Sequence, residues 1–249
     1  MIKNLLKVLP KFIYDYLLEK YHRRFSVMLV NGTPINMFNG IRKYSADKEP
    51  STIEWIDSFR LESVFYDIGA NVGAYSLYAA KKGVCKQIFA FEPGVPTFNV
   101  LLKNIRINSC SRKITPVVSP LDENSKFDEF YYSTLHEGGS QNLFGTLSDQ
   151  NSQTLDVKQK HGVFGVSLDD LIYKYGLLKP DYLKIDVDGN DLNILRGGSK
   201  MLKELKPEIY IEYNSKNTVE KLVLFLSEYS YELVSQDQYD EVTGMVLFR

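Results

Sequence analysis

Short apolar segments alternate with segments of helical hydrophobic spacing along most of the chain after residue 63. The apolar segments lie at 64–68, 87–91, 114–118, 181–186 and 208–213, and the helical ones at 74–82, 95–108, 191–205 and 218–229. Alternation of this kind is typical of parallel βαβ units. Two last apolar segments, 231–235 and 242–248, follow each other without a helix, which predicts an antiparallel pair that closes the sheet. The pattern therefore predicts an α/β fold with a mostly parallel sheet and helices on both faces.

Residues 120–165 interrupt this alternation. The stretch is rich in Ser, Asn, Gln and Gly, and its one strand-like segment is 127–133. A long irregular insertion in a compact domain is usually functional or disordered. The alternation resumes at Ser167-Leu-Asp-Asp170, whose spacing is that of a capping box and predicts the start of a helix. We expect the insertion to lie near a substrate site.

The first part of the chain follows a different pattern. Residues 3–24 place apolar side chains at near-helical spacing among Lys and Arg, which predicts a basic amphipathic helix. Its excess of positive charge suits a helix on a membrane surface, and its apolar stripe suits a helix that covers the edge of the domain. We expect residues 1–60 to form an extension and residues 61–249 to form the main domain.

Within the extension, two further elements are expected. Apolar segments on both sides of Asn31-Gly32, within 27–38, predict a β-hairpin, because Asn-Gly favours a two-residue hairpin turn. A helix is expected over 51–60, capped by Ser51 or its neighbour Thr52.

Composition restricts the classes of function. The 249 residues include 30 Lys+Arg and 31 Asp+Glu, for a formal net charge of -1, which gives no long-range attraction to nucleic acid. The two cysteines, Cys85 and Cys110, lack the spacing of a disulfide framework, a zinc site or a redox motif, so we expect a cytoplasmic protein. No apolar stretch approaches the ~20 residues of a membrane span.

Two motifs together predict a pocket for an adenosyl group. The first expected strand ends in Asp67-Ile-Gly69-Ala-Asn71-Val-Gly73, which leads into a helix. Glycine lets the backbone approach a ligand closely, and the N-terminus of the next helix favours a negative group. The next strand ends in Glu92, where an acid is placed to accept hydrogen bonds from the hydroxyls of a ribose bound across the strand ends.

A third motif, Lys184-Ile-Asp186-Val-Asp188, ends a later strand in two carboxylates two positions apart. Alternate residues of an extended chain point to the same face, so these acids can orient a hydroxyl nucleophile, act as a base or hold a divalent cation. Asp188 alternatively caps the helix that follows. Glu212, at the end of the next strand, would join Asp186 and Asp188 as an oxygen ligand if Mg²⁺ is bound, although nothing in the sequence requires a metal.

In this order, the motifs resemble the FkbM family of S-adenosylmethionine-dependent O-methyltransferases. The matching segments are Glu49-Pro50-Ser-Thr, 66–73 with Tyr75-Ser76, Phe91-Glu-Pro93, 99–104, 167–171, 183–189 and 208–212. The resemblance implies a Rossmann-like class I methyltransferase fold, with a seven-stranded, mostly parallel sheet and an antiparallel last strand. It also implies S-adenosylmethionine as the methyl donor.

The resemblance assigns roles to particular residues. By similarity, the residues expected at the cofactor are Asp67, Gly69, Asn71 and Gly73 at its methionine part, Glu92 at its ribose, Ser119 near its adenine, and Asp186. Asp186, with Asp188 beside it, is the first candidate to accept the proton from the acceptor hydroxyl, although the family often has Glu at the position of Asp188. His136, in the insertion, is the second candidate, because histidine titrates near neutral pH.

The acceptor that the resemblance implies is a hydroxyl group on a sugar of a surface polysaccharide or glycan, or on a small secondary metabolite. In the insertion, rings and hydrogen-bonding groups that suit a sugar are offered by Tyr131, Tyr132, His136, Ser140 and Gln141. Two other hypotheses stay open. One is an NAD-dependent oxidoreductase, which also places an acid at a ribose but has a different glycine fingerprint. The other is a cofactor-binding but inactive module of a glycan-assembly complex.

Overall fold

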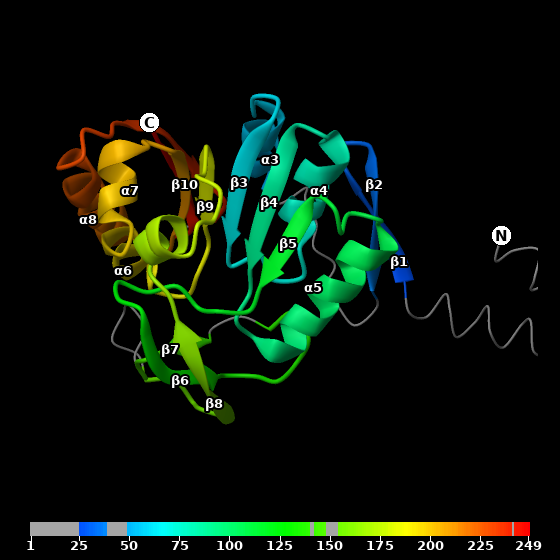
Figure 1. Cartoon of the computed structure of the whole chain (residues 1–249), viewed down its shortest axis with the longest axis horizontal. Coiled ribbons are helices and arrows are strands. Elements are labelled where there is room, and N and C mark those ends of the chain that lie inside the picture. The colour runs from blue at the N-terminus through cyan, green and yellow to red at the C-terminus, as the bar shows by residue number, and fades with distance from the viewer. Residues whose placement is uncertain (1–24, 39–48, 140–141, 148–153, 241) are drawn as a thin grey trace, which may run out of the picture.

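The computed structural model describes residues 25–38, 49–139, 142–147, 154–240 and 242–249. Its centre is a seven-stranded sheet in the order β11-β12-β10-β9-β3-β4-β5 (Figure 1). The strands are β3 (Ser63–Ile68), β4 (Cys85–Phe91), β5 (Ile114–Val117), β9 (Tyr182–Ile185), β10 (Glu208–Tyr213), β11 (Leu233–Gln238) and β12 (Gly244–Phe248). β12 runs antiparallel to both of its neighbours, and the other pairs are parallel. The predicted fold class, with its antiparallel closing pair, is confirmed.

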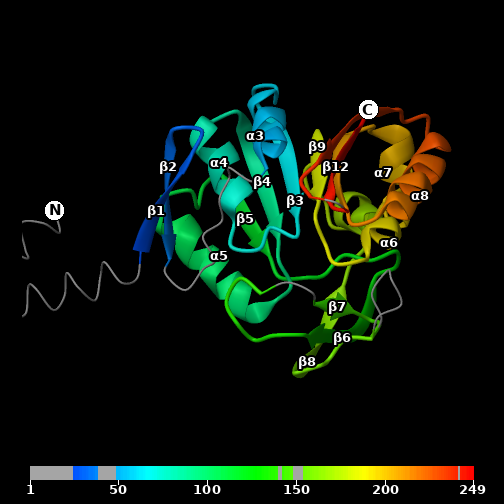
Figure 2. The same cartoon turned by 180° about the vertical axis from the view of Figure 1, so that it is seen from behind.

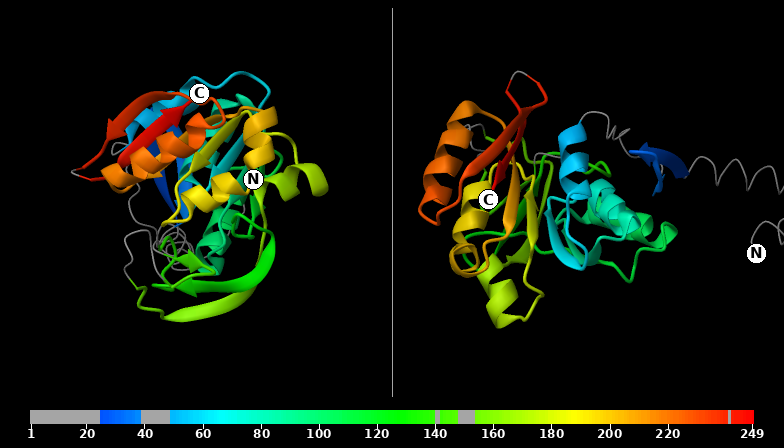
Figure 3. Two further views of the ribbon diagram at one scale, coloured as in Figure 1. Left: turned by 90° about the vertical axis from the view of Figure 1, so that its left-hand side faces the viewer. Right: turned by 90° about the horizontal axis from the view of Figure 1, so that it is seen from above.

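Helices cover both faces of the sheet (Figure 1 and Figure 3). One face carries α3 (Pro50–Asp57), α4 (Ala74–Lys82) and α5 (Val95–Ile107), and the other carries α6 (Asp191–Arg196), α7 (Ser199–Glu204) and α8 (Lys216–Ser227). All six residues of β3 are buried between the two apolar clusters. A strand that is covered on both faces needs a nearly continuous apolar run, as the sequence has at 64–68. Among the described helices, none has the length and apolar character needed to cross a membrane.

The predicted hairpin is present as β1 (Phe25–Val30) and β2 (Thr33–Phe38). Asn31 and Gly32 have φ values of 44° and 73°, as a two-residue turn with left-handed positions requires. The hairpin packs against α4 and α5, where the Asn104 and Asn108 side chains bond to the β2 backbone. Residues 1–24, with the predicted amphipathic helix, lie outside the described residues, and the division of the chain at residue 60 stays a prediction.

The helix expected over 51–60 differs from the structure at both ends. α3 begins one residue earlier, after Glu49, and ends at Asp57. Its N-cap is Glu49, whose side chain makes no capping hydrogen bond, and the Ser51 and Thr52 hydroxyls contact the Tyr239 hydroxyl, at 3.1 and 3.2 Å. The predicted cap is therefore wrong, and these hydroxyls join α3 to the β11–β12 hairpin.

The single helix predicted over 191–205 is also wrong, since α6 and α7 are separated near Gly197. A Cβ at Gly197 would lie 2.3 Å from the carbonyl oxygen of Asp122, so the chain is held against a neighbouring loop at this point. The cap predicted at Ser167 is present, because Ser167 Oγ accepts a hydrogen bond from Asp170 N at 3.1 Å. The turn that it begins is a short π-helix, η3 (Asp170–Lys174).

The insertion is more regular than predicted. Besides β6 (Lys126–Tyr132), which matches the expected strand, it contains β7 (Leu143–Phe144) and β8 (Gln159–Gly165). These strands form an antiparallel sheet in the order β7-β6-β8, which lies across the carboxyl ends of β3, β4 and β5 (Figure 1 and Figure 2). We call it the small sheet. The sequence signal was weak because β7 has only two residues and β8 buries only one of its seven.

Candidate active site

A cavity of about 290 Å³ opens where the carboxyl ends of the parallel strands meet the small sheet. Ligands of open parallel sheets usually bind at this edge. Its wall comes from the turns after β3, β4, β5 and β9, from the end of β10, from α6 and from the insertion. The predicted site residues that line it are Gly69, Asn71, Glu92, Ser119, Asp186, Asp188 and Glu212. Those that do not line it are Asp67, Gly73 and His136.

The turn after β3 is rich in glycine because neighbouring parts of the protein leave no room for side chains. Gly69 has a φ of +79°, and a Cβ there would lie 1.8 Å from the Asp186 carbonyl oxygen. Gly73 has a φ of +89° and precedes α4, and a Cβ there would lie 2.5 Å from Leu101 Cδ1. Each position combines a left-handed backbone with a close contact. Gly69 thus lets the ends of β3 and β9 lie side by side in the cavity wall.

Asp67 lies behind this turn and is 0% exposed. Its Oδ2 accepts hydrogen bonds from Ser76 N at 3.1 Å and Ser76 Oγ at 2.5 Å, so it holds the first turn of α4 against β3. Its Oδ1 is buried without a hydrogen-bond partner among the described residues. Burial raises the pKa of Asp67, and the Lys184 ammonium partly opposes this rise. The structure thus shows a supporting role for Asp67, and contact with a ligand stays a prediction.

Glu92 joins the turns after β3 and β4. Its Oε1 accepts a hydrogen bond from Gly94 N at 2.8 Å, and its Oε2 accepts one from Asn71 N at 3.0 Å. Burial raises the pKa of Glu92 to about 7, because the two backbone N–H groups only partly offset it, and the charges of Asp188 and Asp186 add to the rise. A carboxylate oxygen has a second lone pair, so the ionised side chain can also accept hydrogen bonds from hydroxyl groups in the cavity.

A charged cluster lies beside Glu92 on the same face of the sheet. Lys184 and Asp186 are two positions apart on β9 and its end, and the parallel register brings Glu212 of β10 next to Asp186. Lys184 Nζ donates to Asp186 Oδ2 at 2.6 Å, and the Lys184 side chain is 1% exposed. Burial and the charge of Asp186 raise the pKa of Glu212 to about 9, against the attraction of Lys184. The cluster therefore holds one ion pair next to a carboxyl group whose pKa lies above its ordinary value and which shares a hydrogen bond with Asp186.

Glu49, at the N-cap of α3, and Tyr75, in α4, extend this cluster. The Tyr75 hydroxyl donates to the Glu49 carboxylate, and Lys184 Nζ lies 5.0 Å from the centroid of the Tyr75 ring. Burial raises the pKa of Glu49, although Lys184 and the Tyr75 hydrogen bond act in the opposite direction. Sequence reasoning did not assign these residues or Lys184 to the site. The available signal was Lys184 itself, since a charged residue inside an apolar strand must have buried partners.

The conditional Mg²⁺ ligands are Asp186, Asp188 and Glu212, and all three line the cavity. Among the residues that the structure describes, however, no three acidic, His or Cys side chains form a group suited to hold a metal ion. Asp186 is paired with the Lys184 ammonium instead. Asp188 lies at the cavity edge and is exposed. The geometry thus lends no support to the Mg²⁺ hypothesis at these residues.

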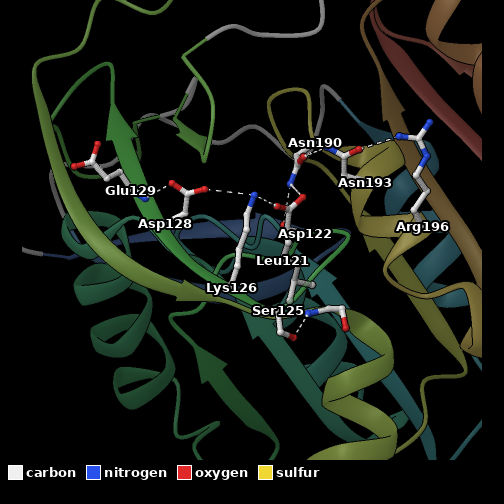
Figure 4. A network of polar contacts seen from close by, with 10 residues as sticks. Leu121, Asp122, Ser125, Lys126, Asp128, Glu129, Asn190, Asn193 and Arg196 are labelled. Atoms are coloured by element: carbon white, nitrogen blue, oxygen red, sulfur yellow. Dashed lines mark hydrogen bonds and ion pairs between the residues drawn. The ribbon is translucent and has the colours of Figure 1, made fainter.

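The opposite end of the cavity is lined by Ser119, Pro120 and Leu121, which follow β5. A polar network fixes this turn (Figure 4). Asn190 Nδ2 donates to Leu121 O at 2.9 Å and to Asp122 Oδ1 at 3.4 Å, and Lys126 Nζ lies 2.9 Å from Asp122 Oδ2. The network connects the turn after β5, the loop before α6 and the start of the small sheet.

The insertion supplies the roof of the cavity. The roof residues are Phe130, Gly138, Gly139, Asn142, Leu143, Phe144 and Thr146. Two hydrogen bonds anchor this part to α5. Gly138 N donates to Thr97 Oγ1 at 3.1 Å, and Val95 N donates to the Tyr132 hydroxyl at 3.0 Å. The insertion thus lines the cavity with residues that sequence reasoning did not single out, and its place at a substrate site stays a prediction.

The residues that had been expected to contact a sugar are placed differently. His136 is exposed and lies outside the cavity lining, so the structure does not bring it together with Asp186. The Tyr131 hydroxyl donates to Glu129 at 2.8 Å, away from the cavity lining. Ser140 and Gln141 lie outside the described residues. The aromatic rings that do line the roof are those of Phe130 and Phe144, which only the strand pairing revealed.

Comparison with known proteins gives consistent results. The family model of the methyltransferase FkbM domain matches residues 67–233. The hexuronic acid methyltransferase AglP of Haloferax volcanii is 26% identical over 144 residues, which cover 58% of this chain and 53% of that protein. The FkbM methyltransferase structure from Methylobacillus flagellatus has a TM-score of 0.54 and 18% identity, covering 76% of this chain and 44% of that one.

A second solved structure that the chain resembles is that of M. capricolum TrmK in complex with S-adenosylhomocysteine. Its TM-score is 0.51 at 15% identity, and the match covers 80% of this chain and 66% of that one. At these identities the two solved structures share the fold. The chain spans about half the length of AglP and of the M. flagellatus protein.

Proposed function

Since the chain belongs to the FkbM methyltransferase family and is a methyltransferase, we propose that it transfers the methyl group of S-adenosylmethionine to a hydroxyl group of a sugar. The observation that carries this proposal is the cavity at the strand ends. There Glu92 presents a buried carboxylate at one end, and Asp186 presents an ion-paired carboxylate further along the sheet. The first suits a ribose and the second suits the hydroxyl that receives the methyl group.

We assign the parts of the cofactor to cavity residues that follow one another along the edge of the sheet. We assign Glu92 to the ribose hydroxyls, because its oxygens keep lone pairs for two donors. Ser119 and the residues after it are assigned to the adenine, and Gly69 with Asn71 to the methionine part. When bound, S-adenosylmethionine supplies a methyl group activated by a positively charged sulfur. The relative TrmK was solved with the product of that cofactor, which supports this assignment.

Asp186 is the residue that we assign as proton acceptor. Methyl transfer needs the acceptor oxygen held in line with the methyl group, and such positioning is worth on the order of 7–11 kcal/mol in favourable cases. A base then needs only to accept the hydroxyl proton. Lys184 binds Asp186 Oδ2, so Oδ1 is the oxygen that we assign to the acceptor. Glu212 beside it shares a side-chain hydrogen bond with Asp186 and so helps to fix the orientation of that carboxylate.

A sugar is the acceptor that the roof favours. Phe130 offers an apolar ring surface, and Asn142 and Thr146 are lining residues with hydrogen-bonding groups. This combination suits a sugar, which has apolar C–H faces and polar edges. The name of AglP, a hexuronic acid methyltransferase, supports the same class of acceptor. A hydroxyl group of a small secondary metabolite is the alternative, because the chemistry of transfer is the same.

Isothermal titration calorimetry tests the cofactor. S-adenosylmethionine, S-adenosylhomocysteine and NAD are titrated into the wild type, Glu92→Gln, and the control Glu204→Gln on the outer helix α7. We expect the two adenosyl ligands to bind the wild type and the control, and to bind Glu92→Gln about tenfold more weakly, or about 1.4 kcal/mol. Binding of NAD alone, or of none of the three, contradicts the proposal.

Transfer of a labelled methyl group tests the acceptor and the role of Asp186. The substrates are hexoses, oligosaccharides and small aromatic alcohols, and the variant is Asp186→Asn. We expect sugars to be methylated, and the variant to keep its affinity for S-adenosylhomocysteine while it loses turnover. Transfer only to the aromatic alcohols favours the secondary-metabolite alternative. Cofactor binding without transfer to any hydroxyl favours the inactive module of a glycan-assembly complex.

A cytoplasmic location and contact of residues 1–24 with a membrane remain proposals. The basic, amphipathic sequence of that segment is the observation behind the second. Co-sedimentation of the full chain with anionic and with neutral vesicles tests it. Equal recovery with both kinds of vesicle contradicts electrostatic binding to a membrane.

A further inference from the structure

The two ends of the insertion meet at the cavity. Leu121 and Val166 form an isolated parallel bridge, in which Val166 N donates to Pro120 O at 3.0 Å and Asp122 N donates to Val166 O at 3.2 Å. Pro120 and Leu121 also line the cavity at the end assigned to the nucleoside. The small sheet therefore starts from the same backbone that forms this wall.

Asp122, directly after the bridge, is buried with 6% of its surface exposed. Its carboxylate has partners on two sides, Asn190 Nδ2 at 3.4 Å and Lys126 Nζ at 2.9 Å (Figure 4). Its backbone is packed against the end of α6, where a Cβ on Gly197 would lie 2.3 Å from the Asp122 carbonyl oxygen. A buried carboxylate needs such partners, because leaving it unpaired is costly. Asp122 is thus a fixed point directly after Pro120 and Leu121, which line the wall.

Lys126 is the first residue of β6 and reaches from the small sheet to this fixed point (Figure 4). Besides Asp122, its Nζ lies 3.4 Å from Asp128 Oδ2 and 5.5 Å from the centroid of the Phe144 ring. Phe144 lines the roof, whereas Lys126 is not among the lining residues. One ammonium group therefore joins a carboxylate next to the wall to an aromatic ring of the roof.

We propose that Lys126 is a positioning residue of the cofactor site, which holds the Phe144 roof over the nucleoside end of the cavity by joining it to Asp122. The inference rests on the proposed function, because it takes an adenosyl group to be the ligand of that end. Lys126 acts through Phe144 and through the turn after β5. Cofactor binding and the placement of the small sheet are then coupled, and by linkage each favours the other.

A matched pair of lysines on the small sheet allows a direct test. Lys160 of β8 pairs with Glu129 of β6 at 2.7 Å, and its side chain is 56% exposed, against 41% for Lys126. Both lysines pair with an acid of β6, and of the two, Lys126 also pairs with Asp122 next to the cavity wall. The affinities for S-adenosylhomocysteine and for adenosine are measured by calorimetry on full-length wild type, Lys126→Met, Lys126→Arg and Lys160→Met.

We expect Lys126→Met to bind both ligands about fivefold to tenfold more weakly, Lys126→Arg to recover most of the affinity, and Lys160→Met to stay within about twofold of the wild type. Hydrogen exchange supplies a second readout. S-adenosylhomocysteine should slow exchange in β6 and β7 of the wild type and do so less in Lys126→Met. The melting temperature should fall more in Lys126→Met than in Lys160→Met, because only the first leaves the buried Asp122 carboxylate without its ammonium partner, and Lys126→Arg, which keeps the charge, is the control for this loss of stability.

Three results separate this inference from the proposed function. Affinities of Lys126→Met equal to those of Lys160→Met overturn the positioning role. A loss seen with S-adenosylhomocysteine but not with adenosine overturns the assignment of Lys126 to the nucleoside end. If neither ligand binds the wild type, the proposed function fails, and with it the premise of the inference.

Discussion

Replacing Lys184 by Met removes a buried ammonium that faces the acids at the strand ends. The Lys184 side chain is 1% exposed, its Nζ lies 2.6 Å from Asp186 Oδ2, and Met has nearly the same length without the charge. Removing one partner of a buried ion pair typically costs about 3–5 kcal/mol, and we place this variant at the lower end of that range, because the Asp186 side chain is 22% exposed. The free energy of unfolding of a domain is only about 5–15 kcal/mol, so this variant should lose a large part of its stability.

The loss should depend on pH with a definite sign. The folded-state pKa of Asp67 is raised by burial and held down by Lys184, so the variant raises it further. A group whose folded pKa lies above its unfolded pKa contributes stability below the unfolded value and loses it as pH rises through the folded value. The difference in unfolding free energy between wild type and Lys184→Met should therefore be largest near pH 8 and become smaller toward pH 5.

Urea denaturation at several pH values, followed by circular dichroism and by fluorescence of the single tryptophan, Trp55, measures this difference. The control is Arg60→Met, because Arg60 pairs with Asp181 at 3.1 Å but is 75% exposed, and such pairs are worth about 0–1 kcal/mol. A loss for Lys184→Met as small as that of the control, or one that does not change with pH, would refute the reasoning. The comparison requires that the free energy of unfolding of both variants falls with urea concentration at the same slope as that of the wild type.

Three further predictions concern the cavity. Gly69→Ala places a Cβ 1.8 Å from the Asp186 carbonyl oxygen, so cofactor binding measured by calorimetry should be lost. Gly83→Ala is the control, because Gly83 also has a positive φ, +76°, but has open space around it, and this variant should still bind the cofactor. Equal behaviour of the two variants contradicts the steric argument. Because the pKa of Glu92 is raised to about 7, affinity for S-adenosylhomocysteine should increase from pH 6 to pH 8 as the carboxylate ionises, and a flat pH profile speaks against its role at the ribose. Phe144→Ala removes a roof ring that is 7% exposed and should weaken binding of adenosine and S-adenosylhomocysteine alike, while unchanged affinities would remove the roof from the site.

The order of helices and strands was predictable because it depends on local patterns. A strand buried on both faces, such as β3, needs an apolar run of its own, and an amphipathic helix such as α5 needs apolar residues at helical spacing. The Asn31-Gly32 turn is local as well, since both residues adopt the left-handed backbone that their types favour. These elements were predicted to within a few residues of their observed ends.

The errors arose where a distant contact overrides the local pattern. The helix over 191–205 has good helical spacing, but its backbone meets the Asp122 carbonyl at Gly197 and divides there. The small sheet depends on pairing between β6 and two segments with weak patterns of their own, β7 and β8. Propensity is a weak signal when tertiary contacts decide the conformation.

The same division applies to the site. The sequence by itself determined which acids stand at strand ends, because Glu92, Asp186 and Glu212 each follow an apolar run. Only the tertiary structure decided which of them meet. It paired Asp186 with Lys184 and Glu212, and it left His136 outside the cavity lining. The physical reason is that β3, β9 and β10 are far apart in the chain, and their register is set by the packing of the whole sheet, which no local window of sequence contains.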